Sequence, residues 1–305
     1  MQNLAPIALF VYNRPQHTER TLQFLQQNEL AAESHLYIFS DGAKTDNDKE
    51  KVAEVRKIIK KADGFKSVKV IESKTNAGLA NAVITGVTQL IEEYDQIIVF
   101  EDDLITSAHT LAYFNNALNH YREEEKVMHI GAYMYPLNAD DLPQSFFYRA
   151  ATSWGWATWG RAWKNFEPNI DVLLKQFDKK KSAAFSIDHK MNFWKQMQEF
   201  KKGKNNSWAI RWYASIFLKG GITLNPSQSL VNNIGHDGTG VHSGINDIYN
   251  VIINPKQIVE FPTTIAEDPI AYQAIKRFLT KRKGNMVTRV RRFVKEKLTQ
   301  YFSKK

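Results

Sequence analysis

The strongest constraint on the fold is a run of apolar residues, 97–100, that leads directly into three consecutive carboxylates, Glu101, Asp102 and Asp103. The run does not alternate with polar residues, which is typical of a strand buried on both faces of a sheet. We expect the acids at the carboxyl end of that strand, where open α/β sheets bind their ligands. Carboxylate oxygens gathered there suit Mg²⁺ or Mn²⁺. The alternative is an acidic turn or a helix N-terminus after a core strand.

Apolar segments and amphipathic segments alternate through the first hundred residues. Each apolar segment is short and ends in polar or turn residues, and the segment after it carries apolar residues at helical spacing. This alternation predicts a mostly parallel sheet with right-handed crossovers and flanking helices, an α/β fold. The expected strands are residues 6–12, 35–39, 68–71 and 97–100, and the expected helices are 18–30, 48–61 and 76–90.

Polar side chains follow three of these expected strands, namely Asn13 and Arg14, then Asp41, then the acids at 101–103. The carboxyl ends of parallel strands share one edge of a sheet, so these side chains should converge on a single crevice. No glycine-rich phosphate loop follows the first strand, which argues against a dinucleotide-binding dehydrogenase or a P-loop enzyme. A nucleotide pocket without such a loop needs a cation to neutralise a diphosphate, and Asp103 could hold it.

The composition becomes aromatic between residues 145 and 163. Trp159 and Trp163 are four residues apart and fit the buried stripe of one helix. The segment Trp154-Gly155-Trp156 places flat amphipathic rings beside a glycine, which suits a wall for stacking a sugar as well as core packing. For these two tryptophans both interpretations stay open.

Residues 232–242 are rich in glycine and polar residues, and His236 and His242 lie within this segment. Such a composition favours a flexible loop that orders over a ligand, so we predict a lid that includes Gly238. Each histidine is a possible metal ligand, although hydrogen bonding or surface exposure is the more common role of a single histidine.

The net charge of +9 belongs to the C-terminal end of the chain. Residues 276–305 contain 12 Lys or Arg and one Glu, a net +11, which leaves −2 for the rest. The near-neutral body argues against nucleic-acid binding. Apolar residues on one helical side of the tail instead favour an interfacial helix on an anionic membrane. These residues are Met286, Val290, Phe293, Val294, Leu298 and Tyr301.

Composition sets further limits on the class of protein. The chain has 305 residues, enough for one large domain or two modest ones. It has no cysteine, which excludes disulfides and thiolate metal sites. The N-terminus lacks the pattern of a signal peptide, and no apolar run approaches the roughly 20 residues that span a bilayer. We therefore expect a cytoplasmic protein, with peripheral attachment to the inner face of the membrane through the tail.

The order of these landmarks resembles GT-A fold glycosyltransferases, most closely N-acetylglucosaminyltransferase I and bacterial capsule and lipopolysaccharide sugar transferases. The resemblance spans roughly residues 5–245 and depends on a series of motifs. The motifs are Tyr12-Asn13-Arg14, Ser40-Asp41-Gly42, Asn76-Ala77-Gly78, Glu101-Asp102-Asp103, Trp154-Gly155-Trp156 and the glycine-rich segment 234–242.

The resemblance implies a role for each motif. Arg14 would contact the nucleotide and Asp41 would read uracil. Asp103 would ligate Mn²⁺ or Mg²⁺, Asp102 would reach the ribose or the metal shell, and Glu101 would reach the donor sugar. The implied nucleotide-sugar site is Asn13, Arg14, Asp41, Asn76, Gly78, Glu101, Asp102 and Asp103. The implied donor and acceptor pocket is Trp154, Gly155, Trp156, Trp208 and Arg211, and the implied loop over the diphosphate carries His236, Gly238 and His242.

One position departs from the family pattern. Inverting members use a single displacement and need a carboxylate to deprotonate the acceptor hydroxyl. In relatives this Asp follows a Trp, and the matching pair here is Trp208-Ala209. Three explanations stay open: the correspondence is shifted, another acid such as Asp237 substitutes, or the chain binds a sugar nucleotide without transferring the sugar.

These observations together predict a Rossmann-like GT-A domain at residues 1–265 and a basic helical tail at 266–305. The domain would comprise a nucleotide-binding half, 1–135, and a donor and acceptor half, 136–265. The expected activity is inverting, metal-dependent transfer of a hexose or N-acetylhexosamine from a UDP-sugar to a glycan acceptor. The resemblance places this reaction in polysaccharide or lipopolysaccharide synthesis, on an acceptor that is lipid-linked if the tail binds the membrane.

Overall fold

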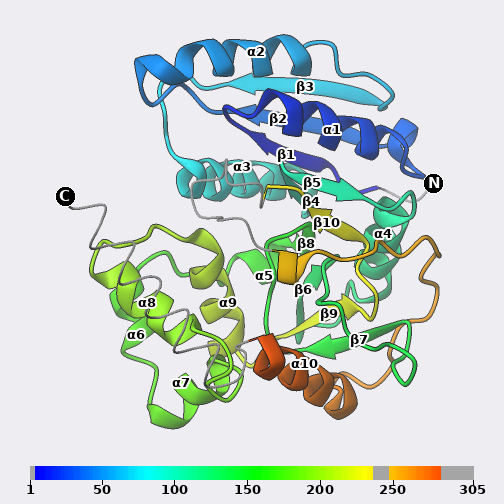
Figure 1. Cartoon of the computed structure of the whole chain (residues 1–305), viewed down its shortest axis with the longest axis vertical. Coiled ribbons are helices and arrows are strands. Elements are labelled where there is room, and N and C mark those ends of the chain that lie inside the picture. The colour runs from blue at the N-terminus through cyan, green and yellow to red at the C-terminus, as the bar shows by residue number, and fades with distance from the viewer. Residues whose placement is uncertain (1–3, 236–246, 283–305) are drawn as a thin grey trace.

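The computed structural model describes residues 4–235 and 247–282, and within them one central sheet runs through the molecule (Figure 1). Its strand order is β3-β2-β1-β4-β8-β6-β9-β7. The first four strands are parallel to one another, and the β6–β9 pair is also parallel. Strands β8 and β7 run antiparallel to their neighbours. The sheet is therefore mixed, with a wholly parallel N-terminal half.

The parallel half follows the predicted alternation of strands and helices. Strand β1 is followed by α1, β2 by α2, and β3 by α3, which leads into β4. Right-handed crossovers put α1 and α2 on one face, whereas α3 returns across the sheet on the other face. The bounds are β1 Ile7–Val11, α1 Pro15–Gln26, β2 His35–Ser40, α2 Lys49–Ile59, β3 Ser67–Glu72, α3 Leu79–Tyr94 and β4 Gln96–Glu101.

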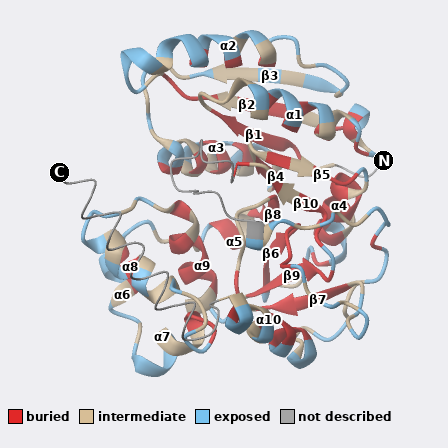
Figure 2. Cartoon of the chain, viewed as in Figure 1, coloured by how far each residue is buried: buried red, intermediate tan, exposed pale blue. Residues whose placement is uncertain are grey.

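Helix α1 begins three residues before the predicted start, at Pro15. Proline is favoured at this position because its φ angle is already helical and its missing N–H would have no helical partner. All five residues of β1 are buried, and so are Ile97, Ile98, Val99 and Phe100 in β4 (Figure 2). The prediction of a central strand buried on both faces is therefore confirmed.

The C-terminal half of the sheet is assembled from segments that are distant in sequence. Its strands are β6 Val127–Gly131, β7 Ser145–Tyr148, β8 Trp156–Trp159 and β9 Ile222–Pro226. A separate antiparallel pair joins β5, Leu104–Thr106, to β10, Val231–Asn233. Through this pair, a segment more than 120 residues away reaches the end of β4. Proximity in sequence does not suggest this pairing.

Of the remaining helices, α4, α5 and α10 contact strands of the C-terminal half of the sheet, whereas α6, α7 and α8 form a cluster with α9 beside it (Figure 1). Their bounds are α4 Thr110–His120, α5 Gly160–Trp163, α6 Ile170–Leu174, α7 Lys179–Phe185, α8 Phe193–Lys201, α9 Trp208–Leu218 and α10 Pro269–Arg282. Short 3-10 turns occupy Ala31–Glu33, Asp46–Asp48 and Asp247–Tyr249. The expectation that Trp159 and Trp163 share one helix is wrong. Trp159 ends β8, because this segment pairs with β4, and only Trp163 is helical.

Helix α10 belongs to the segment expected to form a basic tail. Its apolar side, which includes Tyr272, Ile275 and Leu279, is buried, and the helix contacts β7. This part of the segment is thus packed on the body of the protein. Residues 283–305, with the predicted interfacial face, lie outside the described residues. Across the described ranges, every helix is too short or too polar to cross a bilayer.

Candidate active site

The carboxyl ends of β1 and β4 meet at the point where the crossovers reverse direction. Here the Arg14 guanidinium donates a hydrogen bond to Oδ2 of Asp103 at 2.8 Å and lies 3.9 Å from Oδ1 of Asp102. The Tyr12 backbone N–H donates to Oδ2 of Asp102 at 3.2 Å. The predicted convergence of Arg14 with the acids is therefore present. Ligands of open α/β sheets bind at such a reversal point.

Strand β10 brings a third segment to the same acids. The Asn233 side-chain amide donates to Oδ1 of Asp103 at 3.2 Å, and the Ile234 N–H donates to the Asp103 carbonyl at 2.8 Å. Both carboxylate oxygens of Asp103 are thus held, one by Arg14 and one by Asn233. Sequence reasoning did not select Asn233. Its position at the start of the predicted polar loop, 232–242, was the available signal.

Gly235 passes close to this ion pair. A Cβ atom on Gly235 would lie 2.3 Å from Oδ2 of Asp103 and 2.8 Å from Nη1 of Arg14. Both distances are shorter than any ordinary contact, so a side chain here would push the Arg14–Asp103 pair apart. The absence of a side chain is what allows the backbone after β10 to pack against the acids.

The surroundings of Glu101 and Asp102 disfavour the ionised forms of these two acids. Burial raises the pKa of Glu101 to about 8, and the charges of Asp103 and Asp102 contribute to the increase. Burial and Asp103 also raise the pKa of Asp102, to about 7. Arg14 lowers both pKa values, but a single guanidinium cannot balance three carboxylates. The site therefore has an excess of negative charge that a cation would offset.

Asp41 has a different environment from the other acids. One oxygen accepts from the N–H groups of Gly42 and Ala77, each at 2.8 Å. The other accepts from the Asn76 side chain at 3.0 Å and from the Gly78 N–H at 2.9 Å. A carboxylate has about four acceptor positions, so all of them are engaged. In this structure Asp41 fixes the loop that precedes α3, and the loop lacks a free carboxylate oxygen for reading uracil.

Tyr12 and Asn13 connect the Asp41 region to the acids. The Tyr12 hydroxyl accepts from the Lys44 N–H at 3.0 Å, while the Tyr12 backbone N–H contacts Asp102. The Asn13 side chain donates to Oδ1 of Asp48 at 2.8 Å. Asp48 was not among the predicted site residues, and it also accepts from Thr45 at the start of a turn. These contacts join the ends of β1, β2 and β4 into one polar edge.

The two tryptophans of the Trp-Gly-Trp segment have different roles. Trp156 lies in β8 and is 0% exposed, so its ring is part of the core and does not form a sugar-stacking wall. Trp154 is half-buried and packs edge-on against Tyr133, with ring centroids 4.4 Å apart. Gly155 has φ of +66°, and a Cβ atom added to it would lie 3.1 Å from the Phe100 ring. Only Trp154 of the pair remains accessible to a ligand.

Helix α9 carries the last predicted pocket residues. Burial raises the pKa of Glu101, and the side chain of Trp208, in the first turn of α9, is among the groups that lower it. Arg211 is buried and donates to the carbonyls of Ser207 and Pro168, at 3.2 and 3.1 Å, so it is used in packing. Ala209 is half-buried and packs against the core. His236, Asp237, Gly238 and His242 lie outside the described residues.

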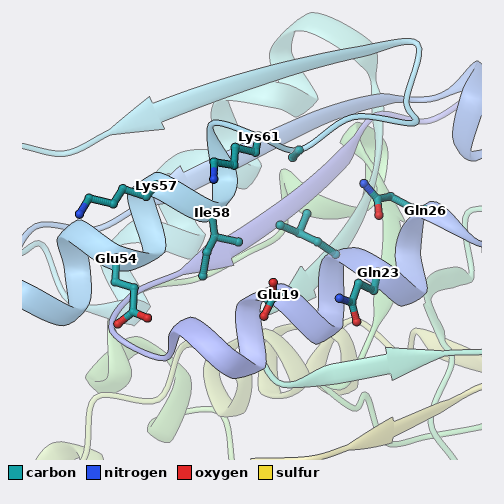
Figure 3. A pocket seen from close by; sticks show the side chains of 9 residues that line it. Glu19, Gln23, Gln26, Glu54, Lys57, Ile58 and Lys61 are labelled. Carbon is teal, nitrogen blue, oxygen red and sulfur yellow. The ribbon is translucent and has the colours of Figure 1, made fainter.

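A groove lies between α1 and α2 (Figure 3). It is lined by Glu19, Gln23, Gln26, Glu54, Lys57 and Lys61, among others. None of its lining residues is among the predicted site residues. Its open and mixed-charge character is that of a solvated helix interface.

Within the described ranges, no group of three or more His, Asp or Glu side chains is placed to hold a metal ion without other ligands. This arrangement suits Mg²⁺ or Mn²⁺ only together with a substrate, since such ions are often held by one or two carboxylates plus phosphate oxygens. Asp103, with Asp102 beside it, fits that requirement, because both are oxygen ligands in a site of excess negative charge.

The mixed sheet, the acidic strand end and the ion pair at the crossover reversal define an α/β enzyme of the GT-A type. The chain matches the model of glycosyl transferase family 2 over residues 7–142, which include Arg14 and all three acids. The resemblance to GT-A glycosyltransferases is thereby confirmed, and the chain is a glycosyltransferase.

No curated protein sequence matches the chain. Among solved structures, the chain is similar to a mannosyltransferase from Pyrobaculum calidifontis in complex with GDP-Man and Mn²⁺. The two are 11% identical, the alignment covers 72% of each chain, and the TM-score is 0.41.

Proposed function

We propose that this glycosyltransferase moves a sugar from a nucleotide sugar, preferably a UDP-sugar, to a glycan acceptor in a metal-dependent, inverting reaction. The observation that carries the proposal is the Arg14–Asp103 pair at 2.8 Å, formed where β1 and β4 end at the crossover reversal. It combines a guanidinium, which binds phosphate oxygens well, with a carboxylate suited to a hard cation. Both groups would offset the negative charge of a diphosphate leaving group.

The chain's own residues would divide the work in the following way. Asp103, supported by Asp102, would hold the Mn²⁺ or Mg²⁺, and the metal would supply electrostatic stabilisation of the departing diphosphate. Arg14 would exchange part of its contact with Asp103 for a phosphate oxygen. The loop fixed by Asp41, with Asn76 and Gly78, would border the nucleoside. The preference for uracil derives from the family resemblance alone, since Asp41 is engaged within the chain.

Binding measurements test the donor and the metal together. Thermal shifts should be recorded with UDP, UDP-glucose, UDP-N-acetylglucosamine, GDP and GDP-mannose, with and without Mn²⁺. A ligand that binds only the folded state raises the melting temperature. We expect stabilisation by a nucleotide sugar that depends on Mn²⁺. Stabilisation that is equal with EDTA would contradict metal dependence, and no response to any compound would contradict the proposed donor.

Activation of the acceptor is tested at position 209. Inversion in a single displacement requires a base near the acceptor hydroxyl, and Ala209 occupies the position where relatives carry Asp. The Ala209→Asp variant should therefore be assayed for transfer beside the wild type. A large rise in turnover would identify a chain that lacks its base. Unchanged turnover would leave Asp237 or a shifted correspondence as the explanation.

The cellular setting follows from the tail and the resemblance. We propose a cytoplasmic enzyme that acts on a lipid-linked glycan in polysaccharide synthesis and attaches to anionic membrane through residues 276–305. Binding to vesicles that contain anionic lipid, with release by salt, supports this placement. Equal affinity for neutral vesicles would contradict it.

A further inference from the structure

The start of α9 lies on the same side of the sheet as Glu101. In β4, Val99 and Glu101 are two residues apart and point to the same face. Val99 is directly opposite Trp156 in the antiparallel β4–β8 register, so Trp156 shares that face. Trp208 stacks on Trp156 with ring centroids 5.1 Å apart and an interplanar angle of 28°. The register and the stacking together place the Trp208 ring beside Glu101.

The stack continues away from the site into the core. Trp156 stacks on His129, with centroids 5.4 Å apart and rings inclined by 12°. His129 Nδ1 accepts a hydrogen bond from the Trp212 indole at 3.2 Å, which fixes the imidazole. Trp212 is one turn after Trp208 on α9. Two points of contact therefore fix the Trp208 ring: its stacking on Trp156, and the helix that Trp212 anchors to β6.

Burial, Asp103 and Asp102 raise the pKa of Glu101, whereas Arg14 and the Trp208 side chain lower it, as an indole N–H that faces the carboxylate would. Trp208 is only 4% exposed, so water does not compete strongly for this donor. An indole N–H can donate a hydrogen bond but cannot accept one, so the edge of the ring that carries the N–H has to face the carboxylate. Glu101 in turn adjoins Asp102 and Asp103, whose charges oppose its ionisation.

We propose that Trp208 is a positioning residue: its indole N–H holds one oxygen of Glu101, so that the other oxygen can accept a hydroxyl of the donor sugar. This inference rests on the proposed function, in which Glu101 faces the sugar of the nucleotide sugar. It gives a function to the stacked rings of Trp208, Trp156 and His129, which lie behind the site. The rings form a rigid base that keeps a half-buried carboxylate oriented among like charges.

The binding experiment compares a nucleotide sugar with its nucleotide. Trp208→Phe retains an aromatic ring and removes the N–H, so binding of UDP-glucose should weaken by about tenfold, the effect of one hydrogen bond to a charged group. Binding of UDP should be unchanged. GDP-mannose and GDP serve as a second pair. Equal weakening of sugar ester and diphosphate would overturn the proposal, because it would indicate general damage to the site.

Trp163→Phe is the matched control. Trp163 belongs to the same cluster, but its indole donates to Thr88 at 2.9 Å and not to Glu101. Its variant should bind UDP-glucose as the wild type does. Glu101→Gln completes a double-mutant cycle with Trp208→Phe. If Trp208 acts through Glu101, the double variant should be no weaker than Glu101→Gln alone, and additive losses would overturn the proposal.

An NMR measurement separates this inference from the proposed function. The Trp208 indole ¹H–¹⁵N signal is assigned by its absence in Trp208→Phe, and it should shift in Glu101→Gln. A signal that does not move would overturn the positioning role whatever the protein binds. A wild type that binds none of the four nucleotides would instead overturn the proposed donor, while the indole signal still decides the contact.

Discussion

The two halves of the central sheet hold their functional groups by different forces. In the parallel half, the ends of β1 and β4 carry charged groups, and Arg14, Asp102 and Asp103 are held by an ion pair and hydrogen bonds. In the mixed half, Trp156, Trp208 and His129 are held by ring stacking. Glu101 stands between the halves, since it lies in β4 and contacts Trp208 from α9. The parallel half therefore supplies the charged groups of the site, and the mixed half fixes the orientation of Glu101.

The halves also differ in how they respond to pH. Glu101 and Asp102, at the end of β4, have pKa values raised by burial and by the negative charge of Asp103. His129, in β6, has a pKa lowered to about 3 by burial. Raised acid pKa values make the folded state less stable at high pH, whereas a lowered histidine pKa makes it less stable at low pH. Variants in each half should therefore change opposite sides of the stability profile.

The largest expected effect is loss of the Asp103 carboxylate. Asp103→Asn removes the proposed cation ligand and the partner of Arg14, so turnover should fall by about a hundredfold or more, as when a key charge-stabilising group is removed. The measurement is sugar transfer or hydrolysis with UDP-glucose and Mn²⁺.

Asp46→Asn is the control for this variant. Asp46 also pairs with a cation, Lys49, at 2.7 Å, but it is 89% exposed and lies on a turn before α2. Its variant should retain wild-type turnover. An Asp103→Asn protein of normal activity would show that the parallel half does not place the reacting charges.

The parallel half of the sheet could be predicted from the sequence because the residues that determine it are close together in the chain. Each strand and the helix after it are neighbours in the chain, and the strand ends at Arg14 and Glu101–Asp103 meet by the topology of parallel sheets. The mixed half was not accessible in this way. Strand β8 pairs with β4 across some 60 residues, and its Trp159 fitted a helical stripe equally well.

Two site features depend on contacts that sequence patterns do not encode. Asn233 reaches Asp103 only because β10 pairs with β5 across more than 120 residues. Asp41 was expected to face a ligand, and instead its four acceptor positions hold the loop at 76–78. A polar strand end indicates where a site lies, but the hydrogen bonds formed within the chain decide which groups remain for a ligand.

The next effect in size is expected at Gly235. Gly235→Ala places a Cβ against both members of the Arg14–Asp103 pair, and overpacking of this kind costs about 1–3 kcal/mol. The free energy of unfolding in urea should fall by that amount, and Mn²⁺-dependent binding of UDP-glucose should weaken. Gly203→Ala is the control for a loss of stability without crowding at the site, because φ of +68° strains an alanine there but nothing lies within 4 Å of the added Cβ. It should lower stability and leave UDP-glucose binding unchanged; if it weakened binding as much as Gly235→Ala, the crowding at the ion pair would not be the cause.

A smaller effect is the dependence of stability on alkaline pH. Glu101 and Asp102 have folded-state pKa values of about 8 and about 7, above their ordinary values of 4.5 and 3.8. Their contribution to stability is therefore complete below about pH 4 and is lost as the pH rises through 7 and 8. Without metal, the unfolding free energy should fall between pH 5.5 and 8.5, with a slope of at most about 1.4 kcal/mol per pH unit for each of the two protons.

The Asp102→Asn variant should flatten this alkaline decline, because its amide does not ionise. Glu72→Gln is a suitable control, since Glu72 pairs with Lys60 at the surface, 3.0 Å away. Urea titrations at both pH values measure the difference. An Asp102→Asn protein with an unchanged decline would show that Asp102 is not a source of it.

The smallest effect belongs to the mixed half and has the opposite sign. His129 is 0% exposed and stays neutral in the folded protein, because burial lowers its pKa to about 3 from 6.5. An unfolded chain would bind a proton there below pH 6.5, so this group's stabilising contribution is lost as the pH falls from 6.5 toward 3. The slope cannot exceed about 1.4 kcal/mol per pH unit for one proton.

The double variant His129→Phe/Trp212→Phe removes the imidazole together with the indole N–H whose hydrogen bond it accepts, so no donor is left unpaired. Its stability should depend less on pH between 6.5 and 5 than that of the wild type, while the alkaline decline set by Glu101 and Asp102 should remain. If the alkaline decline disappeared as well, the two halves would be coupled through the aromatic stack and would not respond to pH independently.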